Sequence, residues 1–321
     1  MAPSFLVLTL STGLALLAPG IALSQNYPLK PIRLVTAEVG GATDVAARLI
    51  AQGLASRFGQ QVLVENRGGS AIIPAQIVAQ APADGHTLLF YSSTIWLLPF
   101  MQDNVPYDPV KDFSPVTLAV SMPTILVVHP SLPVKSVREL IALARAMPGK
   151  LNYGSSGSGG ANHLSPELFK AMARVDIVRI AYKGAATALN ELISGQLQLM
   201  FPAMASGLPH VKSGRLRALA VTTALPTALA PGLPTVAAAG LPGYESTLRL
   251  GLLAPAGTPP TLIKRLHQET VGVLNRGEVR ERLFNAGAEV IGSSPEEFES
   301  TVKSEMPKWA AVIRNARIRA E

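Results

Sequence analysis

Residues 31–57, PIRLVTAEVGGATDVAARLIAQGLASR, constrain the fold most, because they predict a short apolar strand, a glycine turn and a helix. Gly40 and Gly41 allow a tight turn whose backbone can approach a ligand without a Cβ clash. Thr43 or Asp44 is a suitable cap for the helix. The first N–H groups of a helix lack intrahelical partners and lie at the positive end of its dipole, so this turn is a candidate seat for a carboxylate or phosphate. The same pattern also describes an α/β crossover that binds nothing.

Strand-like and helix-like segments alternate from residue 31 onward, which predicts an α/β fold with parallel sheets covered by helices on both faces. Ser136 with Glu139, and Ser294 with Glu297, have the spacing of a capping box and predict two helix starts. Pro307 predicts a kink or break in the last helix. A segment rich in Pro and Asp, 104–115, is expected to be a loop, and further strands are expected at 61–65, 87–91, 124–129, 151–153, 177–180, 197–201, 216–222 and 248–254.

These segments favour two lobes. The strands at 124–129 and 248–254 are candidates for the two crossings between lobes, since each lies where one set of α/β units ends and another begins. We therefore expect residues 27–123 with 249–321 to form lobe 1, and residues 124–248 to form lobe 2. Ligands of open α/β sheets bind beyond the carboxyl ends of the strands, so a cleft between two such lobes would collect several loops.

The first 24 residues are typical of a secretory signal peptide, with an apolar run and a small-x-small site at Ala22-Leu23-Ser24. Cleavage is expected after Ser24, which predicts an exported protein. A transmembrane anchor is the competing interpretation, but the apolar run stops at Pro19-Gly20, short of the roughly 20 residues that span a bilayer. The chain has no cysteine, so disulfides, thiolate catalysis and a cysteine lipid anchor are excluded.

The formal net charge is +7, and the first charged residue is Lys30. The mature chain therefore stays basic after removal of the leader. Such a surplus can steer anions toward a cleft. Nucleic acid is not an expected partner, because the basic residues are dispersed, aromatic residues make up only 5% of the chain, and no nucleic-acid motif is present.

A second loop, YGSSGSGGANH at 153–163, packs glycines and serines between a predicted strand and a predicted helix, and its N–H groups and hydroxyls could donate to a carboxylate. A flexible connection is the alternative interpretation. Pro166 leaves two helix starts open, Asn162 and Ser165, because proline is comfortable at the first helical position. Tyr182, Lys183 and Gly184 follow another predicted strand and add a hydroxyl, a cation and further N–H groups.

Catalytic patterns are missing from the sequence. The serines near His163 form no G-x-S-x-G elbow, and the five histidines are scattered without paired metal-ligand spacing. Neither glycine loop matches the phosphate-loop or dinucleotide fingerprint. No catalytic residue, metal or cofactor is therefore expected.

Taken together, these segments resemble the Bug family of periplasmic solute-binding receptors, which belong to tripartite tricarboxylate transporter systems. The resemblance spans about residues 27 to 320 and includes YPLKPIRLV with GGATD, LVENRGG, APADGHTLL, LNYGSSGSGG with NHLSPELFK, AYKGAATALNELISGQLQLMF, LPHVKSGRLRALAVT, and AGLPGYES ahead of GLLAPAGTP. It implies a type II periplasmic-binding-protein fold, in which two α/β lobes close on a small organic acid.

The resemblance also implies that backbone amides of the two glycine loops hold the ligand carboxylate. Carried over residue by residue, it points to Gly40, Gly41, Ala42, Thr43, Asp44, Ser92, Ser156, Ser158, Gly160, Asn162, His163, Tyr182, Lys183 and Gly184.

One departure from the family pattern concerns the first turn. The family usually reads close to VPFPPGGATD, whereas this chain has Ala37 in place of the aromatic residue and a carboxylate at Glu38. A negative charge beside a carboxylate site opposes an anionic ligand unless it is paired or turned to solvent. We therefore include Glu38 among the site residues, as the basis of the hypothesis that the ligand carries an amine or amide beside its carboxylate.

The leading hypothesis is a non-catalytic receptor that captures a small carboxylate and delivers it to membrane subunits of a tripartite transporter. Two alternatives stay open from the sequence: a secreted hydrolase or lyase on the same two-lobed fold, and an orphan receptor that reports its ligand to a sensor.

Overall fold

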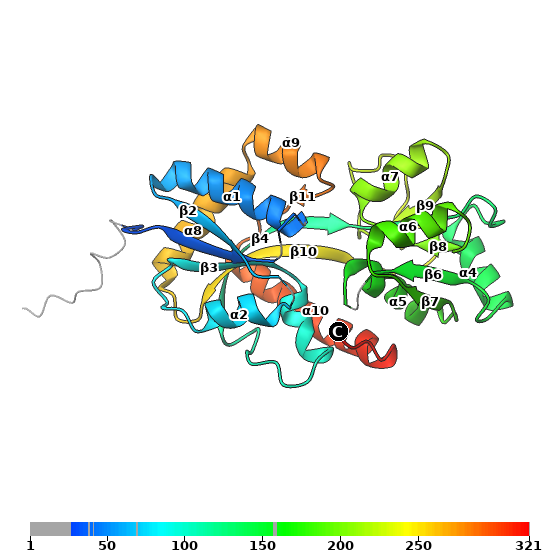
Figure 1. The fold of residues 1–321 in the computed structure, drawn as a ribbon, viewed down its shortest axis with the longest axis horizontal. Helices are drawn as coiled ribbons and strands as arrows, with labels where there is room; N and C mark the ends of the chain where they lie inside the picture. Colours follow the sequence, from blue (N-terminus) through cyan, green and yellow to red (C-terminus); the bar gives the residue numbers. More distant parts are fainter. Residues whose placement is uncertain (1–26, 38, 41, 69, 157–158, 321) are drawn as a thin grey trace, which may run out of the picture.

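The computed structural model describes residues 27–37, 39, 40, 42–68, 70–156 and 159–320, with Ala42 described in its backbone only. Two sheets organise the chain, and each carries helices on both faces, so the molecule has two lobes (Figure 1). Lobe 1 is the six-stranded sheet with its helices, and lobe 2 is the five-stranded sheet with its helices.

The sheet of lobe 1 has the strand order β11-β4-β10-β3-β1-β2. The first three strands of the chain are parallel to one another, whereas β10, β4 and β11 are antiparallel to their neighbours, so the sheet is mixed rather than parallel as expected. Its strands are β1 (Ile32–Thr36), β2 (Val62–Asn66), β3 (Thr87–Ser92), β4 (Phe113–Pro123), β10 (Thr247–Pro255) and β11 (Glu289–Val290).

Helices cover both faces of this sheet, with α1 and α9 on one side and α2 and α10 on the other (Figure 1). The helices of lobe 1 are α1 (Ala42–Phe58), α2 (Ile72–Ala79), α3 (Thr94–Leu97) with the short 3-10 turn η1 (Leu98–Phe100), α8 (Pro260–Leu274), α9 (Gly277–Asn285) and α10 (Pro295–Asn315).

The sheet of lobe 2 has the order β7-β6-β8-β5-β9, in which β6 is parallel to β7 and β8 while β5 is antiparallel to β8 and β9. Its elements are β5 (Ile125–Val128), α4 (Val137–Ala146), β6 (Asn152–Ser155), α5 (Ala161–Ala173), β7 (Val178–Ala181), α6 (Ala185–Ile193), β8 (Leu199–Met200), α7 (Met204–Lys212) and β9 (Arg217–Val221).

The crossings between the lobes involve β4, a strand that the sequence did not predict. Part of the expected loop at 104–115 belongs to this strand, which runs antiparallel to β10 along the middle of lobe 1. The chain then enters lobe 2 at Thr124, so the predicted crossing strand at 124–129 is β5, inside the second sheet. The return crossing leads into β10, where a strand was expected at 248–254.

A buried hydroxyl cluster, made of Thr124, Ser165, Thr222 and Ser246, lies where these crossings meet. The hydroxyl of Thr222 donates to the carbonyl of Thr124 at 2.9 Å, and the oxygen atoms of Ser165 and Ser246 are 2.8 Å apart. The hydroxyl groups of the cluster thus satisfy one another where the crossings meet.

Helix capping follows the sequence at both predicted capping-box starts. The hydroxyls of Ser136 and Ser294 accept hydrogen bonds from the N–H groups of Glu139 and Glu297, which confirms the N-terminal ends of α4 and α10. The predicted break at Pro307 was wrong as a helix end, because α10 continues through it to Asn315.

The start of α5 settles the alternatives at Pro166. The helix begins at Ala161, with Gly160 as its N-cap, and Pro166 lies inside it. The early turn is held because the N–H groups of His163 and Leu164 both donate to the carbonyl of Gly160, at 2.9 Å each. Buried contacts of Ser165 in the hydroxyl cluster add to this, so they offset the single helical hydrogen bond that proline forfeits.

Alternation of side chains divides the core into layers. Ile125 and Val127 of β5 join one buried cluster with α6 and α7, whereas Leu126 and Val128 join another with α4 and α5, as the two-residue period of a strand requires. The second of these clusters continues into lobe 1, where it includes Val35 of β1 and the apolar side chains of α3 and α10. The two lobes therefore share one continuous apolar core on that side.

Contacts on the opposite side also join the lobes. The hydroxyl of Thr227, in lobe 2, donates to the carboxylate of Glu289 in β11 at 2.6 Å. The backbone of Gly287, before β11, lies so close to α7 that a Cβ there would be 3.1 Å from the nitrogen of Ala205. Among the helices in the described part of the chain, none has the length and apolarity needed to span a membrane.

Close packing between β10 and α10 generates a test of the lobe 1 core. A Cβ atom at Gly251 would lie 2.4 Å from the Cζ atom of the buried Phe298. Replacing Gly251 by Ala is therefore expected to lower the free energy of unfolding by about 1–3 kcal/mol, the usual cost of overpacking. Urea unfolding of the variant measures this change.

Gly277→Ala in α9 is the matched control, because nothing lies within 4 Å of a Cβ at that position. Its stability is expected to equal or exceed that of the wild type, since alanine favours a helix over glycine. Equal stabilities of the Gly251 and Gly277 variants would contradict the packing argument.

Candidate ligand-binding site

The turn between β1 and α1 is held by one buried carboxylate. Asp44 is only 3% exposed, and its Oδ2 atom accepts a hydrogen bond from the N–H of Gly40 at 3.0 Å. Gly40 itself has a φ of +83°, a backbone conformation that favours glycine. Asp44 lies in the first turn of α1, so it folds back on the glycine turn instead of capping the helix from in front. Its carboxylate is therefore occupied in fixing the turn.

Asn66 and Arg48 complete this brace. The amide of Asn66 donates to Asp44 Oδ1 and to the carbonyl of Ala37, both at 2.8 Å, and so ties the end of β2 to both sides of the turn. The guanidinium of Arg48 lies 3.0 Å from the carboxylate and also donates to Asn66 Oδ1 at 2.9 Å. We call Asp44, Arg48 and Asn66 the first-turn brace.

The electrostatics of the brace keep Asp44 ionised. Burial raises the pKa of its carboxyl group, but hydrogen bonds from Gly40, Asn66 and Arg48 lower it by more, so the pKa lies below its ordinary value. The charge of Arg48 compensates that of Asp44. The N–H groups at the start of α1 can therefore face an anion without a net negative charge behind them.

Ser92 ends β3, which lies beside β1 in the sheet, so the two carboxyl ends meet at one edge. Its hydroxyl donates to Thr94 Oγ1 at 3.0 Å, at the start of α3. The backbone of the next residue, Ser93, donates to the carbonyl of Arg249 in β10 at 2.8 Å. The expected loop after β3 is thus connected to the strand that leads back from lobe 2.

The loop after β6 is held by a cation in lobe 2. Arg179, in the neighbouring strand β7, donates from Nε to the hydroxyl of Ser155 at 2.7 Å and from Nη2 to the carbonyl of Ser156 at 3.0 Å. Asn162, in the first turn of α5, donates to the hydroxyl of Ser156 at 2.9 Å. The beginning of the loop is fixed to both flanking elements.

His163 fixes the end of the same loop. Its Nδ1 atom accepts a hydrogen bond from the N–H of Gly159 at 3.2 Å, and the side chain is 4% exposed. Burial lowers the pKa of this imidazole to about 4, with the positive charges of Arg179 and Lys170 acting in the same direction. The ring is therefore neutral at physiological pH and serves as an acceptor for the turn.

Tyr182, Lys183 and Gly184 join β7 to α6, beside the β6–α5 loop. The N–H of Tyr182 donates to the carbonyl of Ser155 at 2.9 Å, and Gly184 is the N-cap of α6 in an extended conformation. Lys183 is exposed. No atom lies within 4 Å of a Cβ placed at Gly184, so this helix start faces open space.

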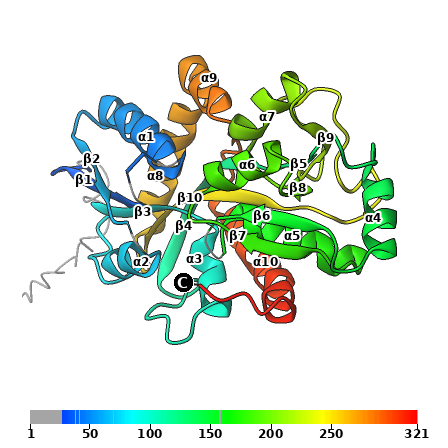
Figure 2. The same ribbon diagram turned by 45° about the vertical axis from the view of Figure 1, so that its right-hand side comes forward.

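The β6–α5 loop of lobe 2 contacts lobe 1. A Cβ at Gly159 would lie 2.7 Å from the sulfur of Met101, which follows η1 in lobe 1. The N-terminal end of α1 points from lobe 1 toward lobe 2 in both views (Figures 1 and 2). The start of α1 is therefore directed toward the lobe that carries the second glycine loop.

The structure therefore gathers the described site residues into two groups, one at the edge of each sheet. The first comprises Gly40, Thr43, Asp44 and Ser92, and the second comprises Ser156, Gly160, Asn162, His163, Tyr182, Lys183 and Gly184. Glu38, Gly41 and Ser158 lie outside the described residues, and Ala42 is described only as the first residue of α1.

Three residues that fix the loops were missed as site residues. Arg48 could have been found from its position four residues after Asp44 on a helix, the spacing of an ion pair. Asn66 and Arg179 depend on strand pairing, which brings Asn66 opposite Thr36 and Arg179 opposite Tyr153. Their roles could not be read from sequence spacing alone.

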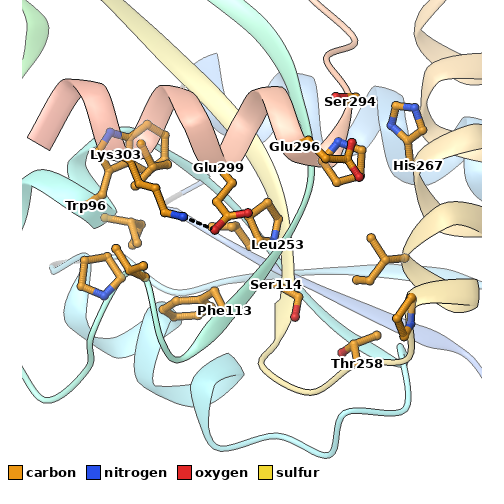
Figure 3. A pocket seen from close by; sticks show the side chains of 18 of the residues that line it. Trp96, Phe113, Ser114, Leu253, Thr258, His267, Ser294, Glu296, Glu299 and Lys303 are labelled. Atoms are coloured by element: carbon orange, nitrogen blue, oxygen red, sulfur yellow. Dashed lines mark hydrogen bonds and ion pairs between the residues drawn. The ribbon is translucent and has the colours of Figure 1, made fainter.

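A separate pocket of about 640 Å³ lies in lobe 1, between α8, α10 and the segment that leads into β4 (Figure 3). Apolar side chains, including Trp96, Phe113 and Leu253, form much of its wall. Lys303 and Glu299, one turn apart on α10, pair with each other on its wall. None of the described site residues of the two glycine loops lines this pocket, so it is a different feature of the molecule.

Metal binding has no support in the described part of the chain, which contains no cluster of three or more His, Asp or Glu residues suited to a metal ion.

The brace yields a test with Asp44→Asn, which keeps the shape of the side chain and removes its charge. At pH 7 the free energy of unfolding of the variant is expected to be about 1.5–3 kcal/mol lower than that of the wild type, the range for hydrogen bonds to charged groups. Because the folded pKa of Asp44 is depressed, its contribution is present above the unfolded pKa of about 3.9 and is lost as pH falls through the lower, folded value.

Urea unfolding at pH 7 and near pH 3 checks both statements. The difference in the free energy of unfolding between wild type and variant should be smaller at the lower pH. A gap that stays constant with pH would show that the charge of Asp44 does not hold the turn.

The neutral state of His163 yields a second test, by NMR titration of its ring. Protonation is expected near pH 4, well below the ordinary value of about 6.5. Since the unfolded state binds the proton first, His163 is expected to reduce stability progressively as pH falls from about 6.5 toward 4. His163→Gln should lack this part of the pH dependence, whereas titration of the native ring near pH 6.5 would contradict the acceptor role.

The sequence and fold were compared with those of known proteins. The family model described as "Tripartite tricarboxylate transporter family receptor" matches residues 46–318. BugT of Bordetella pertussis is 32% identical over 94% of this chain and 95% of its own length. Among solved structures, Rpa4515 of R. palustris with adipate is 38% identical with a TM-score of 0.76, covering 91% of this chain and 99% of that one.

MatC from Rhodopseudomonas palustris with bound malate is 30% identical, with a TM-score of 0.71, and covers 89% of this chain and 100% of that one. The predicted Bug resemblance and the two-lobed fold are thereby confirmed, and these relatives are binding receptors rather than enzymes. The chain belongs to the family of tripartite tricarboxylate transporter receptors, and it is a solute-binding protein of the Bug type.

Proposed function

We propose that this protein is an exported receptor that holds a small dicarboxylate between the β1–α1 turn and the β6–α5 loop. The observation that carries the proposal is the pair of braced turns, one on each lobe, whose helix starts supply backbone donors. A carboxylate at each helix start would be favoured by unpaired N–H groups and by the dipole. Two such seats suit a ligand with a carboxylate at either end.

The bound acids of the relatives support this ligand class. Adipate and malate, found in the two R. palustris structures, are both small dicarboxylates. In this chain the braces match an anionic ligand, because Asp44 is compensated by Arg48 in lobe 1 and the brace of lobe 2 is the cation Arg179. We take 27–123 with 249–321 and 124–248 as the two lobes that enclose the ligand.

Delivery to a membrane transporter completes the proposal. The leader of residues 1–24 would direct the chain to the periplasm, with cleavage after Ser24. There the receptor would present its solute to the membrane subunits of a tripartite transporter, the system named by the family.

Calorimetric titration against adipate, malate, tricarboxylates and amino acids tests the ligand class. Binding of at least one dicarboxylate is expected. In Gly184→Asn, the new side chain would accept a hydrogen bond from an N–H at the start of α6 and so compete with the ligand for it. This variant should weaken binding by about tenfold, which corresponds to one lost charge-assisted hydrogen bond. Asparagine is as good an N-cap as glycine, so the fold should be retained.

Gly277→Asn in α9 is the control, because this glycine also faces open space but lies away from both glycine loops. Unchanged affinity in both variants would remove the α6 start from the site, and failure of every acid to bind would reject the proposed function. The same titration of Glu38→Gln bears on the amine hypothesis: loss of a preference for amino acids supports a role for Glu38, and unchanged selectivity removes it.

A further inference from the structure

A cavity of about 670 Å³ lies behind the β6–α5 loop, between lobe 2 and the C-terminal residues 315–319. Its lobe 2 wall is formed by α5 and β7, and its other wall is the segment that follows α10. The C-terminal end of the chain lies between the two lobes in Figure 1. The cavity therefore has one wall from each lobe.

Positive charge dominates this cavity. Among the described residues that line it, the cations are Lys170, Arg179, Arg317 and Arg319, and the carboxylate is Glu167. Glu167 is already engaged, since it accepts hydrogen bonds from Lys170 at 2.7 Å and from the hydroxyl of Tyr153 at 2.6 Å. Glu167 is paired with Lys170, and Arg179 is engaged by the β6–α5 loop.

The two C-terminal arginines have little else to bind. Arg319 makes an exposed ion pair with Asp103 at 3.3 Å, a kind of contact that contributes little in water. The side chain of Arg317 is exposed and has no hydrogen bond or ion pair to any residue that the structure describes. The arginine fork suits tetrahedral oxyanions, which it can bind through two parallel hydrogen bonds.

His163, on the lobe 2 wall, is subject to the same positive charges. It lines the cavity, and the charges of Arg179 and Lys170 act together with its burial to lower the pKa of its ring to about 4. The imidazole is therefore neutral and adds no competing charge.

Residues of the lobe 2 wall also hold the β6–α5 loop in place. Arg179 donates to Ser155 and Ser156 at the start of the loop, and His163 accepts from Gly159 at its end. On the other wall, the N–H of Ala320 donates to the carbonyl of Met101 at 3.1 Å, and Met101 packs against Gly159. An ion held in the cavity would thus lie beside Arg179 and beside the C-terminal segment that Ala320 ties to Met101.

We propose that this cavity is a second, regulatory site that binds a phosphate-class dianion, free or as the ester of a small molecule. Such an ion would bridge the cations of lobe 2 to the C-terminal arginines and so favour the arrangement in which Gly159 and Met101 are in contact. That arrangement fixes the ligand loop, so the dianion strengthens solute binding; this coupling rests on the proposed function, whereas the anion site itself does not. By linkage, the solute strengthens binding of the dianion by the same factor.

Calorimetry with inorganic phosphate and with glycerol phosphate, in the absence of any solute and at constant ionic strength set by sodium chloride, tests the site directly. Saturable binding of one equivalent is expected. The double variant Arg317→Gln with Arg319→Gln should weaken it by about tenfold or more, as for a lost charge-assisted contact. Tighter binding of glycerol phosphate would support an organic ester as the ligand, and equal binding would support the free ion.

The control is the double variant Arg276→Gln with Arg280→Gln, which removes the same charge from exposed positions of α9 and its N-cap. It should bind phosphate as the wild type does. Equal affinities of the wild type and the C-terminal variant, or equal losses in both variants, would overturn the site.

Titration of adipate with and without saturating phosphate then tests the coupling, which is expected to tighten adipate binding about fivefold or more in the wild type and not in the C-terminal variant. An adipate affinity that phosphate leaves unchanged would overturn the coupling. Because phosphate binding is measured without solute, failure of all acids to bind would count against the proposed function and not against the anion site.

Discussion

The buried carboxylate of Asp44 is the interaction on which the architecture of the binding face depends. It joins the glycine turn, the first helix and the second strand through Gly40, Arg48 and Asn66. A charge in that position is costly unless it is paired and hydrogen-bonded, and here each oxygen atom has donors. The brace holds the backbone while leaving the N–H groups at the start of α1 available to a ligand.

In lobe 2 the backbone of the glycine loop is held by a cation instead of a carboxylate. Arg179 donates to a hydroxyl and a carbonyl of the loop, and the neutral ring of His163 accepts from Gly159. Lobe 1 thus contributes an internally compensated ion pair, whereas lobe 2 contributes a cation close behind the loop. In the proposed site, this distribution of charge favours an anion that contacts the backbone amides of the two loops.

Sequence reasoning located both glycine loops, because glycine turns and capping patterns are local features. It failed where pairing across the fold decides the structure. β4 carries Pro115 and Pro123, which locally argue against a strand, yet a register shift in its pairing with β10 falls beside Pro115 and accommodates it. Pro166 likewise favoured a later helix start, but the buried contacts of Ser165 keep the first turn of α5. Asn66 and Arg179 acquire their roles only through the neighbouring strands that place them.

The apolar core that runs from Val35 in β1 to Leu126 and Val128 in β5 has a consequence for how the molecule comes apart. Separating the lobes fully would expose this shared layer to water and break the hydrogen bond between Thr227 and Glu289 on the other side, so full separation is unfavourable. Each lobe also has a buried apolar cluster of its own, but this layer belongs to both lobes. Heat or denaturant would therefore unfold both lobes in a single cooperative step. Destabilising one lobe would also make the other lobe more sensitive to proteases.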